Sequence, residues 1–236
     1  MNKNRIWELD AFRGICVIGM VAVHFVYDLV SLYGLVSWEY GPGFAFLMNW
    51  GGVLFLLISG ICATLGSHCV RRGLIVFGCG LLVTAVTVGM YRFGMADKSV
   101  VISFGVLHCL GICMMAWQIL KKLPDWALGI LGIAMTAAGL LITDIRVETP
   151  YLFWLGLITD SFSSADFFPL LPNLGFFLLG ALTGRTLYRS KETLLPKVNA
   201  RKPLICFLTA CGRHSLIIYL LHQPVLTLVI MVLAQL

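Results

Sequence analysis

The stretch WELDAFRGICVIGMVAVHFVYDLV, residues 7–30, is long and apolar enough for a membrane helix but carries ionisable side chains inside it. A helix needs about 20 apolar residues to cross the hydrocarbon core of a bilayer. Arg13, His24 and Asp28 interrupt this stretch. An Arg or Asp facing lipid at the bilayer centre costs about 2.5–3.5 kcal/mol on the insertion scale. The stretch therefore predicts a membrane helix whose polar residues face the inside of a helix bundle.

The whole chain has the composition of an integral membrane protein, since 59% of its 236 residues are hydrophobic and 12% are charged. No polar segment between the apolar stretches is long enough to fold as a separate domain. We therefore predict an all-α, polytopic helix bundle of about seven transmembrane helices that forms a single domain over residues 1–236. The predicted spans are 11–33, 44–66, 73–93, 100–120, 126–144, 167–188 and 213–235, and shorter apolar pieces at 151–158 and 203–210 are placed in an outer loop and at the inner surface.

Membrane topology accounts for the net charge of +6 without a nucleic-acid partner. If the N-terminus lies inside, only Arg92, Lys98 and Arg146 of the 17 Lys and Arg residues fall on the outer side. An excess of Lys and Arg on the inner side is typical of membrane proteins. The asymmetry predicts an N-in, C-out orientation for seven spans. The basic cluster within residues 185–202 can also contact anionic membrane lipids or phosphate.

Four ionisable residues of the first span share one helix face. At about 100° per residue, Asp10, Arg13 and Asp28 all lie within about 40° of His24. His24 and Asp28 are one turn apart, so the carboxylate can orient the imidazole and raise its basicity, as a general base requires. A buried pair that only holds helices together is the alternative. Asp10 and Arg13 form either part of a functional face or a simple ion pair near the inner interface.

Two further histidines lie in apolar spans. His108 occurs in SFGVLHCLG, and His222 shares one face of the last span with Ser215 and Tyr219. No HxxxH or His/Cys spacing accompanies them, so no metal site is predicted. Each histidine taken singly is either a functional group or a packed and hydrogen-bonded core residue.

Five segments in this order resemble the heparan-alpha-glucosaminide N-acetyltransferase catalytic-domain family, especially its short bacterial members. The first and last segments are the most specific. The segments are ELDAFRGICVIGMVAVHFVYDL (8–29), VLFLLISGICATLG (53–66), ISFGVLHCLG (102–111), DFFPLLPNLGFFLLGALTG (166–184) and GRHSLIIYLLHQPVL (212–226).

This resemblance implies a membrane acyltransferase that moves an acyl group, in the first instance acetyl, from cytosolic acetyl-CoA or another acyl-CoA to an acceptor at the outer face. The expected acceptor group is an amine or a hydroxyl, and the acceptor molecule is a glycan, an amine or a lipid with a reactive head group. No metal cofactor is expected. We expect the CoA phosphates at Arg13 and Arg213, and His24 as base or transient acyl carrier with Asp28 orienting it. The residues expected to line the reaction cavity are Asp10, His108, Asp166, Tyr219 and His222.

In the animal lysosomal members, the resemblance places the proposed active histidine in the loop after the first span. The corresponding residues here, SWEYGP (37–42), contain none, so the role is assigned to His24. Likeness to the short bacterial members predicts the bacterial cytoplasmic (inner) membrane. A homodimer is left open, because the small-residue motif Gly180-x-x-x-Gly184 can serve dimerisation or packing within the chain.

Two other function classes compete with the acyltransferase. A small proton-coupled transporter would use the same His and Asp residues as a proton relay. A membrane scaffold would need only structural polar contacts. It would not explain why four ionisable residues share one face of the first span. A pocket for an anionic nucleotide at the cytoplasmic mouth distinguishes the acyltransferase from both.

Overall fold

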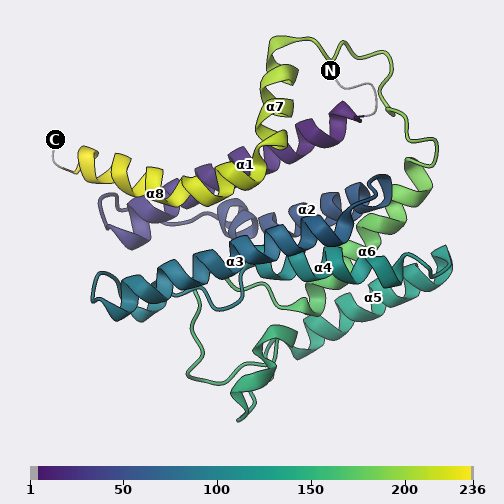
Figure 1. Ribbon diagram of the computed structural model, residues 1–236. Coiled ribbons are helices and arrows are strands. Elements are labelled where there is room, and N and C mark those ends of the chain that lie inside the picture. Colours follow the sequence, from purple (N-terminus) through teal and green to yellow (C-terminus); the bar gives the residue numbers. More distant parts are fainter. Residues whose placement is uncertain (1–4, 235–236) are drawn as a thin grey trace. The chain divides into compact units, whose positions relative to one another are not determined.

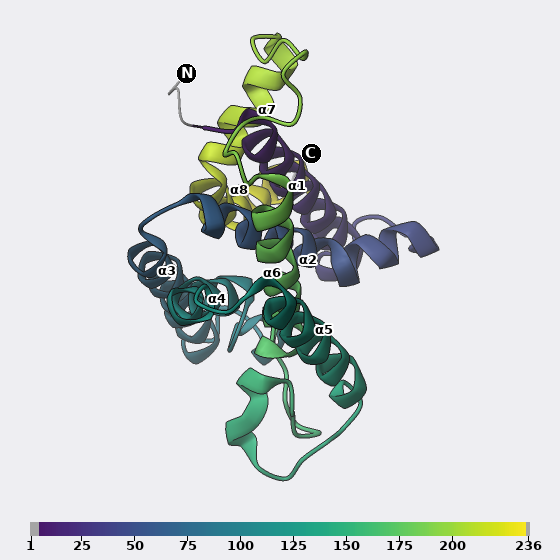
Figure 2. The same ribbon diagram turned by 90° about the vertical axis from the view of Figure 1, so that its right-hand side faces the viewer.

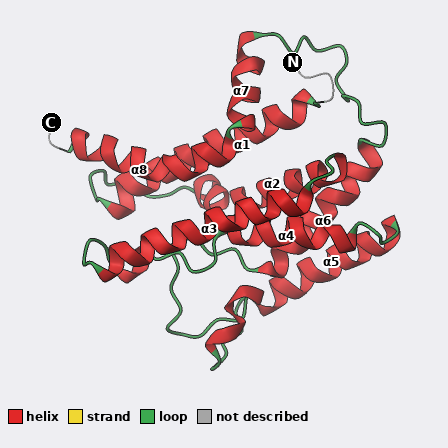
Figure 3. Ribbon diagram, viewed as in Figure 1, coloured by secondary structure: helices red, strands yellow, loops and turns green. Residues whose placement is uncertain are grey.

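The computed structural model describes residues 5–234 as helices joined by loops, which confirms the predicted all-helical, integral membrane fold class. Residues 1–4 and 235–236, which include Lys3 and the end of the last predicted span, lie outside the described residues. Figure 3 shows the helices in red. They are α1 (Trp7–Tyr27), α2 (Pro42–Leu65), α3 (Cys69–Arg92), α4 (Val106–Leu120), α5 (Asp125–Ile142), α6 (Leu170–Leu187), α7 (Pro203–Arg213) and α8 (Ser215–Leu233).

Six helices among residues 5–234 are long and apolar enough to cross a membrane. The predicted span 100–120 contains the shorter helix α4, of 15 residues. Residues 101–105 of this predicted span are not helical and pair instead with a distant segment: the Ala165 amide donates to the Val101 carbonyl (3.0 Å) and the Phe168 amide to the Phe104 carbonyl (2.9 Å). The number of spans and the N-in, C-out orientation stay predictions.

The chain divides into two compact units. The first comprises Met1–Phe55 and Lys191–Leu236, and the second comprises Leu56–Ser190. Helices α1, α7 and α8 belong to the first unit, α3 to α6 belong to the second, and α2 contributes to both. The single domain over residues 1–236 stays a prediction.

In the first unit, α1 packs against α7 and α8 (Figure 1). A side chain at Gly14 would collide with the backbone carbonyl of Leu208, and one at Gly212 with that of Asp10. Two glycines therefore let the backbones of α1 and α7 approach each other closely, as small residues do between membrane helices. The apolar piece at 203–210 is thus part of a helix that packs on α1.

In the second unit, α6 is the most buried of the long helices, with half of its apolar window inside the protein. It packs against α5 and α4, and α3 packs against α4 (Figure 2). A side chain at Gly60 would collide with the Phe177 backbone, and one at Gly180 with that of Leu57. The motif that begins at Gly180 therefore serves packing between α2 and α6, and whether the chain forms a homodimer stays untested.

The outer connection predicted at 145–166 belongs to the second unit and contains a short 3₁₀ helix, Pro150–Leu155. Its end is tied to the start of α4, because the Ser103 amide donates to the Ser164 hydroxyl (3.1 Å). The 3₁₀ helix covers residues 151–155 of the short apolar piece at 151–158. Its predicted place on the outer side of the membrane is not tested.

The close contact between α1 and α7 predicts a stability difference between two glycines of α1. Gly14→Ala should lower the free energy of unfolding by about 1–3 kcal/mol, because the new methyl group overlaps backbone atoms of α7. Gly19→Ala is the matched control, since its side chain would enter open space. Thermal unfolding of the purified protein in detergent measures both. Equal melting temperatures for the two variants would contradict the packing described here.

Candidate functional site

The polar face predicted on the first span meets the last two helices of the first unit at two places. Near its start, Asp10 and Arg13 lie beside Arg213 at the end of α7. Further along, His24 and Asp28 contact His222 and Gln223 of α8. The sequence had placed α1 residues on one face, and the structure shows that α7 and α8 supply their partners.

The first cluster surrounds the buried carboxylate of Asp10, whose residue is 6% exposed. Arg13 Nη1 lies 3.2 Å from Asp10 Oδ1, Arg213 Nε lies 3.4 Å from Oδ2, and Arg5 Nη1 lies 3.7 Å from Oδ2. Three guanidinium groups thus share one carboxylate, so these four residues together carry a net positive charge. Guanidinium groups form forked hydrogen bonds with phosphate oxygens, so this arginine cluster can hold a second anion.

Glu8 anchors the segment that leads toward α7. Its Oε2 accepts a hydrogen bond from the Thr193 hydroxyl (2.8 Å), and its Oε1 accepts one from the Leu194 amide (2.7 Å). Residues 193–194 are therefore attached to the start of α1. The sequence held no signal for this pairing, because the two segments lie 185 residues apart.

The second cluster contains two histidine rings whose centroids lie 4.9 Å apart in an edge-to-face arrangement. His24 Nδ1 donates to the Met20 carbonyl (2.9 Å), and His222 Nδ1 donates to the Tyr219 carbonyl. A carbonyl oxygen only accepts, so Nδ1 carries the proton and Nε2 of the neutral ring keeps a lone pair. Tyr219, predicted at the site, also places its ring 5.4 Å from that of His222.

Asp28 does not make the hydrogen bond predicted for it. Side chains on a helix lean toward its N-terminus, so the His24 ring reaches back to Met20 instead of forward to Asp28. The carboxylate, 1% exposed, accepts a hydrogen bond from Gln223 Nε2 (2.8 Å) and interacts with His24 electrostatically. Asp28 also begins a π-helical turn, Asp28–Leu32, a feature that often marks functional sites.

Gln223 is the site residue that sequence reasoning missed. Its signal was a polar amide within an apolar span, directly between His222 and Pro224. Its Oε1 is buried and has no hydrogen-bond partner among the described residues. A buried acceptor without a hydrogen bond lowers the stability of the fold by about 1–3 kcal/mol. Gln223 Oε1 can therefore accept a hydrogen bond from a further group.

His108 and Asp166, also predicted to line the cavity, lie in the second unit and make local contacts. His108 Nδ1 accepts from the Gly105 amide (3.2 Å), and its Nε2 lies 3.4 Å from the Thr84 hydroxyl. Both ring nitrogens are therefore engaged. Asp166 Oδ2 accepts from the Val106 amide (3.0 Å) at the first turn of α4. Whether His108 and Asp166 line the reaction cavity stays a prediction.

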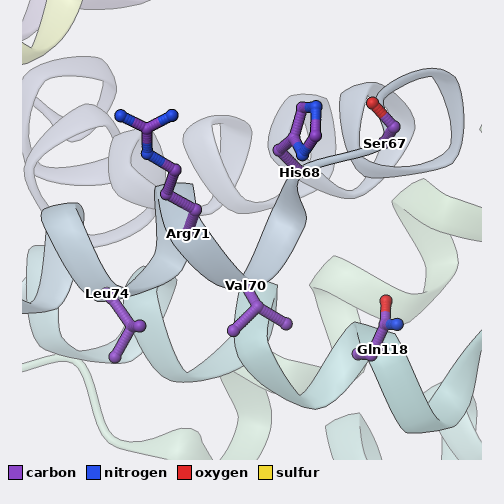
Figure 4. Close-up of a pocket in the computed structure, with 6 residues that line it drawn as sticks. All are labelled: Ser67, His68, Val70, Arg71, Leu74 and Gln118. Carbon is purple, nitrogen blue, oxygen red and sulfur yellow. The ribbon is translucent and has the colours of Figure 1, made fainter.

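Residues 5–234 contain no group of three or more His, Cys, Asp or Glu that could hold a metal ion. A hollow of about 370 Å³ in the second unit is lined by Ser67, His68, Val70, Arg71, Leu74 and Gln118. Figure 4 shows Arg71 and His68 pointing away from Val70 and Leu74, with Gln118 on the same side as Val70 and Leu74. This basic hollow is a second place where an anion can bind.

An apolar groove of about 520 Å³ in the first unit is lined by α1, α8 and Cys211 of α7. Its residues from α1 are Ile18, Val21, Ala22 and Phe25. None of the site residues predicted from the sequence lines either hollow. The clusters at Asp10 and at His24 are therefore defined by side-chain contacts and not by a described cavity.

Comparison with known proteins supports the family suggested by the sequence. The family model described as heparan-alpha-glucosaminide N-acetyltransferase, catalytic, matches residues 5–224. No curated protein and no solved structure gives a significant match. The matched range contains both clusters, from Arg5 to Gln223. The chain belongs to the heparan-alpha-glucosaminide N-acetyltransferase catalytic family and is therefore a membrane acetyltransferase.

Proposed function

We propose that the protein transfers an acetyl group from acetyl-CoA, bound from the cytoplasmic side at the arginine cluster, to an amine or hydroxyl acceptor at the opposite face. A glycan is the acceptor class that the family indicates. The observation that carries the proposal is the order of the two clusters along α1. The arginine cluster, which can hold an anion, lies beside the start of the helix, and the two imidazoles lie near its end. Arg13 and His24 are separated by about 16 Å, at about 1.5 Å per helical residue.

Coenzyme A has the matching shape, since its phosphates and its thioester lie at opposite ends of a long flexible arm. Arg13 and Arg213 supply charged donors for the phosphates, and Asp10 fixes both guanidinium groups. The thioester can then extend along α1 toward His24. Holding donor and base on one rigid helix lowers the entropy cost of bringing them together.

In the transfer step, the acceptor nitrogen or oxygen attacks the thioester carbonyl while His24 Nε2 takes its proton. The carbon–sulfur bond then breaks, and the CoA sulfur receives that proton from the imidazolium. A bond between the acceptor atom and the carbonyl carbon forms, the carbon–sulfur bond breaks, and His24 returns to its neutral form. His24 is suited to this because Nδ1 is held by the Met20 carbonyl, which leaves Nε2 as the basic nitrogen.

The donor site predicts a selective loss of acetyl-CoA affinity. Arg213→Gln and Arg13→Gln should each raise the Kd for acetyl-CoA about 10- to 100-fold, because a charge-assisted hydrogen bond to phosphate is lost. Calorimetry or thermal shift in detergent measures this. Arg92→Gln, an exposed arginine outside the cluster, is the matched control and should bind normally.

Arg71→Gln tests the competing hollow of Figure 4. If this variant loses affinity while Arg13→Gln and Arg213→Gln do not, the donor phosphates bind in the second unit and the assignment to the arginine cluster is wrong. If acetyl-CoA does not bind the wild-type protein at all, a proton-coupled transporter gains support instead.

The proposed role of His24 as general base predicts that its removal lowers kcat but leaves the affinity for acetyl-CoA unchanged. His24→Ala should lower kcat about 10²- to 10⁴-fold, the usual contribution of a general base, with an unchanged Kd for acetyl-CoA. Release of the free CoA thiol in the presence of an acceptor measures turnover. His68→Ala, an exposed histidine of the second unit, should remain active. Undiminished turnover in His24→Ala would remove His24 from the mechanism.

A further inference from the structure

We propose that Gln223 determines which acceptor reacts, because its side-chain oxygen accepts a hydrogen bond from the acceptor's N–H and thereby favours a primary amine over a hydroxyl. This inference rests on the acetyl transfer proposed above. It assigns a specificity-determining residue on α8 next to His222.

The contact with Asp28 fixes the orientation of the Gln223 amide. An ionised carboxylate only accepts hydrogen bonds, so the group that lies 2.8 Å from Asp28 Oδ2 must be the NH₂ of Gln223. A flipped amide would place two acceptor oxygens against each other. The oxygen Oε1 therefore points away from the Asp28 contact.

Gln223 Oε1 is buried and has no partner among residues 5–234. Most buried side-chain polar atoms in folded proteins have a hydrogen-bond partner, in the protein or in ordered water, so an unpaired one needs an explanation. The amide cannot turn to find another donor without losing the bond to Asp28. This oxygen can therefore accept a hydrogen bond from a donor outside the described residues.

The groups around Gln223 offer acceptors for hydrogen bonds and few donors. His24 and His222 each commit their Nδ1 proton to a backbone carbonyl, which leaves Nε2 as an acceptor. Asp28 is an acceptor through both oxygens. Such a cluster complements a ligand that donates more than one hydrogen bond.

A neutral primary amine and a hydroxyl differ in the number of hydrogens that they donate. The reacting amine has two N–H groups: one gives its proton to His24 Nε2 during attack, and the other can remain bonded to Gln223 Oε1. A hydroxyl gives its single proton to His24 and leaves Gln223 Oε1 unpaired. Sites built to pair with a substrate N–H discriminate strongly against analogues that lack it.

The test compares two probe acceptors, glucosamine and glucose, with acetyl-CoA and the full-length protein in detergent. Wild type should favour glucosamine. Gln223→Leu should lower kcat/KM for glucosamine about 100-fold, change kcat/KM for glucose far less, and leave the Kd for acetyl-CoA unchanged. Asn49→Leu, an exposed amide side chain of α2 outside both clusters and both hollows, is the matched control and should keep the wild-type preference.

Gln223→Lys separates acceptor binding from the mere support of Asp28. A lysine ammonium group can donate to Asp28 but has no acceptor oxygen, so this variant should lose the preference for glucosamine while it still binds acetyl-CoA. It also carries the test if Gln223→Leu does not fold, as judged by loss of acetyl-CoA binding.

Two results would overturn the inference while leaving acetyl transfer intact: a wild-type protein that prefers glucose, or a Gln223→Leu variant that loses both acceptors equally. Equal loss would mean that Gln223 acts only through Asp28. A wild-type protein that transfers acetyl to neither probe would instead refute the proposed function itself.

Discussion

Ionisable side chains inside a membrane helix need polar partners, and in this protein α7 and α8 provide them for α1. Asp10 is surrounded by arginines from the start of α1 and the end of α7. Asp28 is buried against Gln223 of α8. An Arg or Asp that faces lipid at the bilayer centre costs about 2.5–3.5 kcal/mol on the insertion scale. The packing of the last two helices on the first therefore supplies polar partners for α1 and assembles both clusters.

Backbone geometry decides how the partners reach α1. Gly14 and Gly212 allow α7 to approach closely enough for Arg213, the next residue, to reach Asp10. The His24 and His222 rings are both oriented by carbonyls of their own helices. A neutral carbonyl fixes the tautomer of an imidazole but stabilises its protonated form less than a carboxylate does. His24 is accordingly suited to accept a proton during reaction and to return it to the leaving sulfur.

In the proposed reaction, one cluster binds the charged acetyl donor and the other transfers the proton. The arginine cluster can bind an anionic donor, whereas the histidines with Gln223 can receive the hydrogens of an acceptor. Both ring nitrogens of His108 are engaged within the second unit, by Gly105 and Thr84. Its place at the reaction cavity stays a prediction.

The sequence by itself determined the membrane-embedded helical class, the shared polar face of α1 and the family, because hydropathy, the helical period and local motifs need no tertiary contacts. It also identified His24, His222 and the arginines as unusual for their positions. Only the tertiary structure decided which groups pair: Asp28 with Gln223, Arg213 with Asp10, and His24 with His222 across 4.9 Å. These pairs join residues about 200 positions apart, and their choice depends on side-chain direction and on where two glycines let backbones meet, neither of which the local pattern of residues encodes.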